Sequence, residues 1–108
     1  MGKYVIKQAK NDKYFFSLKA SNGQIIFSSQ GYASKSACMG GIESVQKNCT
    51  EDSRYERKES SNGKPYFVLK AANHQVIGQS EMYESVAGME NGIESVKKNG
   101  TSEVVEEE

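Results

Sequence analysis

The sequence predicts an α+β fold: a single, mainly antiparallel sheet built from two tandem β-β-β-α-β repeats, with two helices packed on one face and pseudo-two-fold symmetry. The first reason is an internal repeat. A shift of 51 residues aligns Tyr4–Thr50 with Tyr55–Thr101 without a gap, and 22 of the 47 pairs are identical. The second reason is that each copy contains three short strand-like runs and then one stretch with helical periodicity. Two copies are too few for a solenoid, which needs at least three.

We expect residues 1–108 to form one domain, with repeat one at about 3–53 and repeat two at about 54–106. Half of the chain is about fifty residues, and a core of that size is marginal without partners. The residues between the first helix and the second copy, Cys49–Ser53, are too few for a flexible linker. The expected molecule is a monomer that contains an internal pseudo-dimer.

The predicted strands of the first copy are Tyr4–Ala9, Tyr14–Ala20 and Gln24–Ser29. Asparagine begins each of the four connections between strands, and it tolerates a left-handed backbone well. These asparagines are Asn11, Asn22, Asn62 and Asn73. His74 stands where the matching first-copy turn has glycine, which predicts a strained or longer turn.

The second copy begins with a predicted strand, Arg54–Ser60, long enough to pair with the first copy at one end and the second at the other. A further short strand is plausible at Glu103–Glu106. The last residues, 106–108, are expected to fray into solvent.

The predicted helices are Ser34–Asn48 and Ser85–Asn99. Their apolar residues are spaced i, i+4, i+7 on one face, and a serine stands at each N-cap position. Lysines near the C-terminus of each helix suit the helix dipole, and the asparagine there suits a left-handed C-terminal residue. Gly41 and Gly92 lie inside the helices, where glycine costs about 1 kcal/mol against alanine. This repeated cost predicts a close contact between helix and sheet.

Composition excludes several classes of protein. The chain has 14 basic and 14 acidic residues and a net charge of zero, so it lacks the basic excess of a general nucleic-acid binder. No apolar run approaches the ~20 residues of a membrane span, which predicts no membrane partner. The first residues lack the pattern of a signal peptide, and there are only two cysteines. We therefore expect a cytoplasmic protein.

The paired motifs resemble those of one known family. The run F-x-L-K-A-x-N at Phe16–Asn22 and Phe67–Asn73, followed by GIESVxKN at Gly41–Asn48 and Gly92–Asn99, resembles the YegP-like family of small bacterial and archaeal proteins. The resemblance implies β-β-β-α-β units that share one sheet and exchange their last strands. It implies no catalytic residues, because the family has no settled activity. Cys49, which stands against Gly100, is a departure from the duplicated pattern.

The sequence offers little chemistry, and we assign no catalytic, cofactor-binding or metal-ligating residues. His74 is the only imidazole, and it falls in a predicted turn. Cys38 and Cys49 lie about 16 Å apart along one helix, too far for a disulfide. We interpret Cys38 as a buried small hydrophobe and Cys49 as an exposed thiol. The repeated carboxylates Glu43 and Glu94 are interpreted as solvated helix charges.

The better candidate is one face of the sheet. In the second strand of each copy, Phe16, Leu18 and their equivalents Phe67 and Leu69 should face the helices. Alternation then places an aromatic and a lysine of each copy on the opposite face. The candidate partner-binding residues are Phe15, Lys19, Tyr66 and Lys70. The simpler interpretation is an ordinary half-polar outer face.

Two functions from different classes follow. The leading one is a non-enzymatic domain that binds an unknown protein or ligand through the open sheet face or the sheet edges. The alternative is a weak single-stranded nucleic-acid binder that uses aromatic and lysine residues; an enzyme ranks third. Residues 1–53 carry seven lysines and four acids, whereas residues 54–108 carry seven basic residues and ten acids. Nucleic acid would then use Lys3, Lys7, Lys13 and Lys19. The other interpretation of this charge asymmetry is that the basic first half and the acidic second half attract each other.

Overall fold

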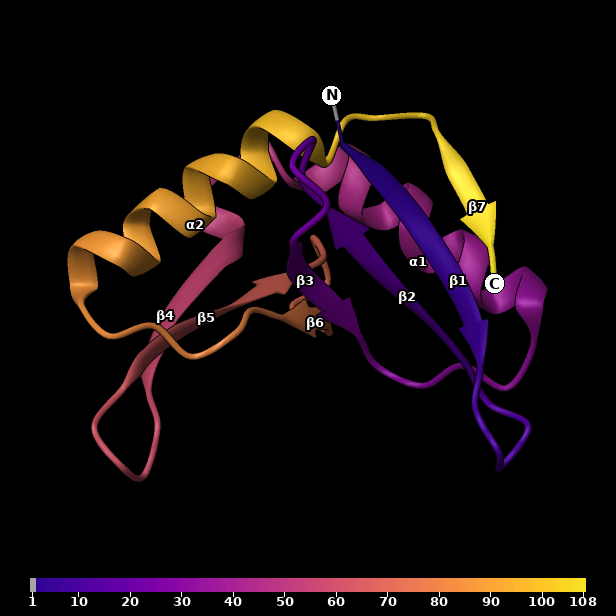
Figure 1. Ribbon diagram of the computed structural model, residues 1–108, viewed down its shortest axis with the longest axis horizontal. Helices are drawn as coiled ribbons and strands as arrows, with labels where there is room; N and C mark the ends of the chain where they lie inside the picture. Colours follow the sequence, from indigo (N-terminus) through magenta and orange to yellow (C-terminus); the bar gives the residue numbers. More distant parts are fainter. Residues whose placement is uncertain (1) are drawn as a thin grey trace.

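The computed structural model describes residues 2–108, which form seven strands and two helices (Figure 1). In the first repeat these are β1 (Lys3–Gln8), β2 (Tyr14–Lys19), β3 (Ile25–Ser29) and α1 (Lys35–Asn48). A short 3-10 turn, Asp52–Arg54, leads into the second repeat. The second repeat contains β4 (Tyr55–Glu59), β5 (Pro65–Lys70), β6 (Val76–Gln79), α2 (Val86–Asn99) and β7 (Val105–Glu107). The order of elements is the predicted one.

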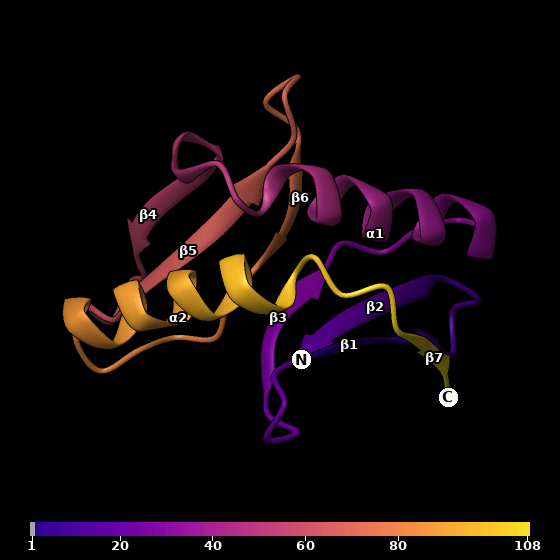
Figure 2. The ribbon, with the colours of Figure 1, turned by 90° about the horizontal axis from the view of Figure 1, so that it is seen from above.

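All seven strands belong to one sheet, in the order β4-β5-β6-β3-β2-β1-β7. The two repeats meet at its centre, where β3 and β6 pair antiparallel through Ser28↔Gln79 and Ser29↔Gly78. Every pairing is antiparallel except that of β7, which lies parallel to β1. The sheet is therefore continuous across the duplication, and both helices lie over the same side of it (Figure 2).

Two expectations about the edges of the sheet are wrong. Within residues 2–108, β4 pairs only with β5, so it does not bridge the two repeats. The C-terminal glutamates do not fray. They continue β7, and the amide of Glu108 donates to the carbonyl of Ile6 at 2.8 Å. The strand that follows the second helix thus returns to the first repeat.

The turns use asparagine differently from the prediction. The left-handed residue is the one after each asparagine: Asp12, Gly23, Gly63 and His74 have φ between 67° and 85°. The side chain of Asn22 instead accepts from the amide of Gln24 at 3.0 Å, and that of Asn73 does the same for Gln75 at 3.1 Å. The His74 turn has the same length as its partner, closed by equivalent bonds from Ala20 to Gln24 and from Ala71 to Gln75.

Both helices begin where predicted. Ser34 accepts from the amide of Ala37, and Ser85 from that of Gly88, each at 3.0 Å. The expected left-handed residue at the C-terminus is absent from both described helices. Both C-cap residues, Cys49 and Gly100, are right-handed. Their backbone carbonyls therefore need partners from elsewhere in the molecule.

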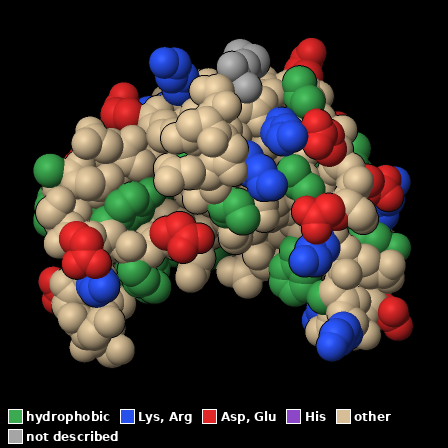
Figure 3. All heavy atoms as spheres, viewed as in Figure 1, with side chains coloured by type: hydrophobic (Ala, Val, Ile, Leu, Met, Phe, Trp, Pro, Cys, Tyr) green, Lys and Arg blue, Asp and Glu red, His purple; other side chains and the backbone are tan. Residues whose placement is uncertain are grey.

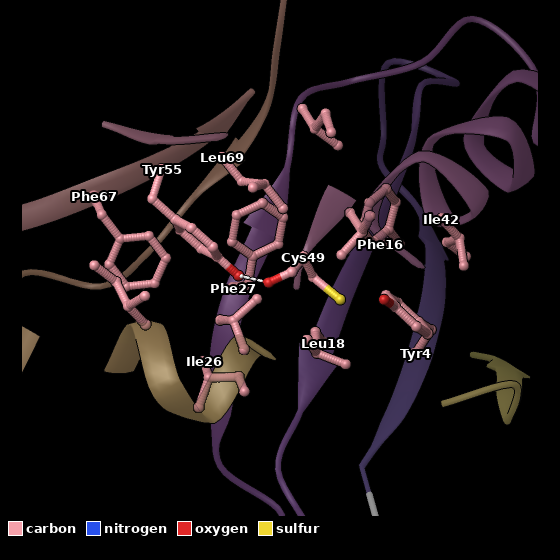
Figure 4. Packing of buried hydrophobic residues seen from close by; sticks show 14 of the residues in the cluster. Tyr4, Phe16, Leu18, Ile26, Phe27, Ile42, Cys49, Tyr55, Phe67 and Leu69 are labelled. Carbon is pink, nitrogen blue, oxygen red and sulfur yellow. Dashed lines mark hydrogen bonds between the residues drawn. The ribbon is translucent and has the colours of Figure 1, made fainter. Parts of the chain in front are cut away.

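Two buried tyrosines supply those partners, each from the opposite repeat. The hydroxyl of Tyr4 donates to the carbonyl of Gly100 at the end of α2, at 2.6 Å. The hydroxyl of Tyr55 donates to the carbonyl of Cys49 at the end of α1, also at 2.6 Å, and Figure 4 shows this bond within the packed core. Burial raises the pKa of both tyrosines well above the ordinary value, so both hydroxyls keep their protons.

The glycines within the helices accommodate a third aromatic ring in each repeat. Tyr32 lies between β3 and α1, and a Cβ added at Gly41 would stand 2.6 Å from its Cζ atom. Tyr83 has the same relation to Gly92, also 2.6 Å at Cζ. The predicted close approach is therefore made to the connection before the helix rather than mainly to a strand. The rings form equivalent trios, Tyr4–Phe16–Tyr32 and Tyr55–Phe67–Tyr83, in which the first two rings meet edge to face and the last two stack.

Equivalent residues of the two repeats meet where the repeats adjoin, and only one residue of each pair carries a large side chain. Cys49 is fully buried against its equivalent Gly100, whose added Cβ would lie 2.7 Å from the Cys49 sulfur. Phe27 is fully buried against its equivalent Gly78, whose added Cβ would lie 2.8 Å from the ring. Cys49 is therefore not the exposed thiol that the sequence indicated.

Adjacent glycines in α1 give a matched test of this packing. We expect Gly41→Ala to lower the free energy of unfolding by about 1–2 kcal/mol, because overpacking against Tyr32 outweighs the helix-propensity gain. Gly40→Ala is the control, since an added Cβ there meets nothing within 4 Å. It should stabilise the protein by about 0.5–1 kcal/mol. Urea unfolding followed by circular dichroism measures both, and equal effects would contradict the packing role.

Candidate functional site: the open face of the sheet

The structure places the candidate residues on the face turned away from the helices. Phe16, Leu18, Phe67 and Leu69 are at most 1% exposed and lie in the core. Their neighbours on the other face are half-buried, and these are Phe15, Lys19, Tyr66 and Lys70. The alternation inferred for the second strand of each repeat is confirmed. A binding role for these four residues stays a prediction.

The strand register extends this surface by matching pairs in the two repeats. Phe15 pairs with Lys7, and Tyr66 pairs with Lys58. Lys19 pairs with Ile25, and Lys70 with Val76. Each repeat thus contributes two lysines, one aromatic and one β-branched residue, which together we call the open face. Its members are Lys7, Phe15, Lys19, Ile25, Lys58, Tyr66, Lys70 and Val76.

The shape of the molecule leaves this face accessible. In the view of Figure 1 the protein is an arch whose two feet are the β1–β2 and β4–β5 hairpins. In that view α2 runs along the top of one arm of the arch, whereas α1 lies behind β1 and β2 in the other. The space-filling view shows the molecule hollowed beneath, between the feet (Figure 3). Two of the apolar members of the open face remain substantially exposed, Ile25 at 43% and Val76 at 38%.

Most lysines on this side of the sheet already have acidic partners. Lys70 lies 3.1 Å and Lys58 3.5 Å from the same carboxylate oxygen of Glu56. The hydrogen bond from Lys70 holds the pKa of Glu56 below its usual value. In the first repeat, Lys3 and Lys7 pair with Glu106 and Glu108. Lys19 makes no ion pair within the described chain. The positive charge available for a ligand is therefore small.

The remaining reactive side chains are unavailable for chemistry or stand alone. Burial raises the pKa of both thiols, Cys38 and Cys49, so they stay protonated. His74 occupies an exposed turn at φ 70° and makes no ion pair within residues 2–108. Within residues 2–108 no group of three or more His, Cys, Asp or Glu side chains could hold a metal ion.

Sequence reasoning missed a groove between α2 and the β2–β3 turn. Its volume is about 700 Å³, and its lining includes Ile26, Tyr83, Asn91 and Ser95. It joins elements that are 60 or more residues apart in sequence, so no local pattern could have indicated it. Sequence reasoning also missed the ion pairs of Arg57 with Glu90 and Asp52, at 2.7 and 3.1 Å, which join β4 to neighbouring elements.

Comparison with known proteins identifies the class to which this tandem α+β fold belongs. The model of a domain of unknown function, DUF1508, matches twice, over residues 9–56 and 60–107. Each match starts just before a β-β hairpin and extends through a helix into the strand that follows it. The chain belongs to this family, in its tandem two-repeat form, and the resemblance to YegP-like proteins is confirmed.

Several similar proteins match this chain over nearly its whole length. The UPF0339 protein YegP of Yersinia pestis is 56% identical over 107 residues, covering 99% of this chain and 96% of that protein. A UPF0339 protein of Acinetobacter baylyi is 55% identical, with 98% and 96% covered. The solution structure of the UPF0339 protein SO3888 from Shewanella oneidensis matches with a TM-score of 0.93 and 48% identity, covering 98% of this chain and 90% of that chain.

No helix in the part of the chain that the structure describes is both long and apolar enough to cross a membrane.

The lysine pairs of Glu56 give the protein a defined dependence on acid. Because the pKa of Glu56 is lower in the folded protein, its stabilisation is present above the unfolded value of about 4.3. It is lost as pH falls through the folded pKa. We expect Glu56→Gln to be less stable than wild type at neutral pH and equally stable near pH 2.5. The matched control is Glu59→Gln on the same strand, which should track wild type in thermal melts at both pH values. A Glu56 variant whose deficit persists in acid would contradict this assignment.

Proposed function

We propose that this protein is a non-enzymatic binding domain that holds a protein partner in the hollow beneath its sheet. One observation carries the proposal: the open face repeats the same lysine, aromatic and β-branched positions in both halves of the arch. An exposed apolar patch with a polar rim is typical of protein-binding surfaces. We further propose that the protein acts as a monomer in the bacterial cytoplasm, where buried, unpaired thiols such as Cys38 and Cys49 stay reduced.

The chemistry of the molecule favours binding over catalysis. A nucleophile needs a lowered pKa or an adjacent base. The core tyrosine and cysteine groups have raised pKa values instead, and the hydroxyls of Tyr4 and Tyr55 already donate to backbone carbonyls. These buried groups stabilise the fold. A function is therefore better supported at the exposed surfaces.

Single-stranded nucleic acid is the less supported alternative. Phosphate binding needs lysines that can exchange counterions for phosphate. Lys3 and Lys7, two of the lysines expected to contact nucleic acid, are paired with Glu106 and Glu108, and Lys70 is paired with Glu56. The basic first repeat therefore attracts the acidic second repeat, as the other interpretation of the charge asymmetry held. Lys13 and Lys19, which make no ion pair within residues 2–108, add little attraction for a polyanion by themselves.

Charge reversal at equivalent positions tests the open face. In this experiment the full-length tagged protein is used to capture partners from a bacterial lysate. The variant of the open face, called the face variant, is Lys19→Glu/Lys70→Glu. Lys47→Glu/Lys98→Glu is the control, because it makes the same charge change at equivalent exposed positions of the two helices. We expect a protein retained by wild type and control to be depleted about tenfold or more by the face variant, as hot-spot losses exceed 1.4 kcal/mol.

Equal retention by the face variant would contradict the proposal. Labelled single-stranded DNA serves as a second probe of the same proteins. We expect no measurable binding by wild type at low salt, and salt-dependent binding that the face variant loses would favour the nucleic-acid alternative.

A further inference from the structure

We propose that the edge of β1 is a binding site for an extended acidic segment of a partner protein, and that β7 occupies this site in the free molecule. The site comprises the outer edge of Lys3–Gln8 together with Lys3, Lys7 and Lys35. It shares Lys7 with the open face, whereas the backbone edge of β1, Lys3 and Lys35 lie outside the residues of that surface. It does not depend on whether the open face binds a partner.

The two edges of the β-sheet are built differently. The free edge strand, β4, has the sequence YERKE, in which four of five residues are charged. Charged residues protect an exposed edge from pairing with other chains. The corresponding strand of the first repeat, β1, is KYVIKQ, and its centre is a run of three buried residues, Tyr4, Val5 and Ile6. An edge of this kind accepts a strand unless another segment covers it, and here β7 covers it.

The backbone of β1 recognises its occupant as a strand. The amide of Tyr4 donates to the carbonyl of Val104 at 2.9 Å, and the carbonyl of Ile6 accepts from the amide of Glu108 at 2.8 Å. The two strands run parallel, with Val5 opposite Glu106. Backbone bonding of this kind gives affinity for any extended segment, whereas the side chains provide selectivity.

Lysines on both faces of the edge select for acidic side chains. Successive residues of a strand point to opposite faces of the sheet. Glu106 and Glu108 meet Lys3 and Lys7 on one face, whereas Glu107 meets Lys35 of α1 on the other. Three consecutive glutamates thus find three lysines, all of them from the first repeat. The chemistry of the site therefore fits an apolar residue followed by several acidic ones.

The resident strand is held weakly enough to be displaced. Val105 is only partly buried against the core, and Val104 is 52% exposed. The three glutamate side chains are each more than half exposed, so salt screens their ion pairs. Segments with few buried contacts open at low cost.

A fixed anchor precedes the strand. The hydroxyl of Ser102, a fully buried residue, donates to the carbonyl of Gly2 at 2.6 Å, and the side chain of Gln46 donates to the carbonyl of Ser102 at 2.8 Å. Opening can therefore begin after Ser102 without disturbing α2. The anchor separates release of β7 from unfolding of the second repeat.

Hydrogen exchange of the wild-type chain tests release of β7. The amide of Tyr4 reports the bond to β7, and the amide of Tyr14, which donates to the carbonyl of Tyr32 within the first repeat, is the control. Raising NaCl from about 0.05 to about 1 M should speed exchange at Tyr4 about fivefold relative to Tyr14, because the ion pairs are screened. No relative change would overturn the proposed opening.

Binding to the released edge is tested with full-length Glu106→Lys/Glu108→Lys, which repels β7 from Lys3 and Lys7. The control is Glu43→Lys/Glu59→Lys, an equal charge change at sites without ion pairs within residues 2–108. The probe is a labelled peptide with the sequence SEVVEEE, that of residues 102–108. We expect it to bind the released variant at least about tenfold more tightly than it binds the control protein, and more tightly than peptide SKVVKKK binds the released variant.

Failure of the acidic peptide to bind the released variant would overturn the site. Sedimentation of the variant as a dimer that ignores the peptide would also overturn it, because the edge would then belong to a second copy of this chain. Neither result depends on capture of a partner by Lys19 and Lys70, so this inference and the proposed function fail separately.

Discussion

The hydrogen bonds from Tyr4 and Tyr55 are the interaction on which the rest of the structure depends. A helix ends with carbonyl groups that no residue of the helix can satisfy. Here the carbonyl of Cys49 accepts a hydrogen bond from Tyr55 of the second repeat, and that of Gly100 accepts one from Tyr4 of the first, each at 2.6 Å. An unsatisfied buried group costs about 1–3 kcal/mol, so each helix end favours the presence of the other repeat. The continuous sheet then follows, with β3 and β6 pairing at its centre.

The same symmetry restricts the sequence where the repeats adjoin. Equivalent residues there face each other, and two large side chains cannot occupy the space of one. At each such position one repeat has a side chain and the other has glycine: Phe27 packs against Gly78, and Cys49 packs against Gly100. Away from that contact the restriction disappears, and the trios formed around Phe16 and Phe67 have nearly identical geometry. The open face lies on the opposite side of the sheet from the core residues Phe27 and Cys49, which is why it can present the same pattern twice.

Local patterns predicted the elements, and the duplication predicted the architecture. Serine caps, apolar spacing and the alternation around Phe16 and Phe67 all report contacts within a few residues or on one face of an element. What sequence reasoning missed depends on residues far apart. The exposed thiol inferred for Cys49 was wrong because its neighbour Gly100 comes from the other repeat. The fraying inferred for residues 106–108 was wrong because their lysine partners lie about a hundred residues earlier or on α1.

For the candidate site too, sequence reasoning predicted the local features and missed those that depend on distant residues. Alternation alone placed Phe15, Lys19, Tyr66 and Lys70 on the face opposite the core. The ion pairs that neutralise the neighbouring lysines could not be predicted, because they need the register between strands. The covered edge of β1 could not be predicted either, since it depends on a parallel pairing between the two ends of the chain. The open face is made by both repeats, so its integrity depends on whether the two repeats fold as one unit.

Hydrogen exchange of full-length Tyr4→Phe tests that joint most directly. The substitution removes one hydroxyl from the first repeat and leaves the carbonyl of Gly100 in the second without its donor. If the repeats fold as one unit, the slowest amides of β2 and β5 should lose protection by the same factor, about fivefold or more for a loss of 1 kcal/mol or greater. Loss of protection in only one of these two strands would show that the repeats unfold separately and would contradict the account.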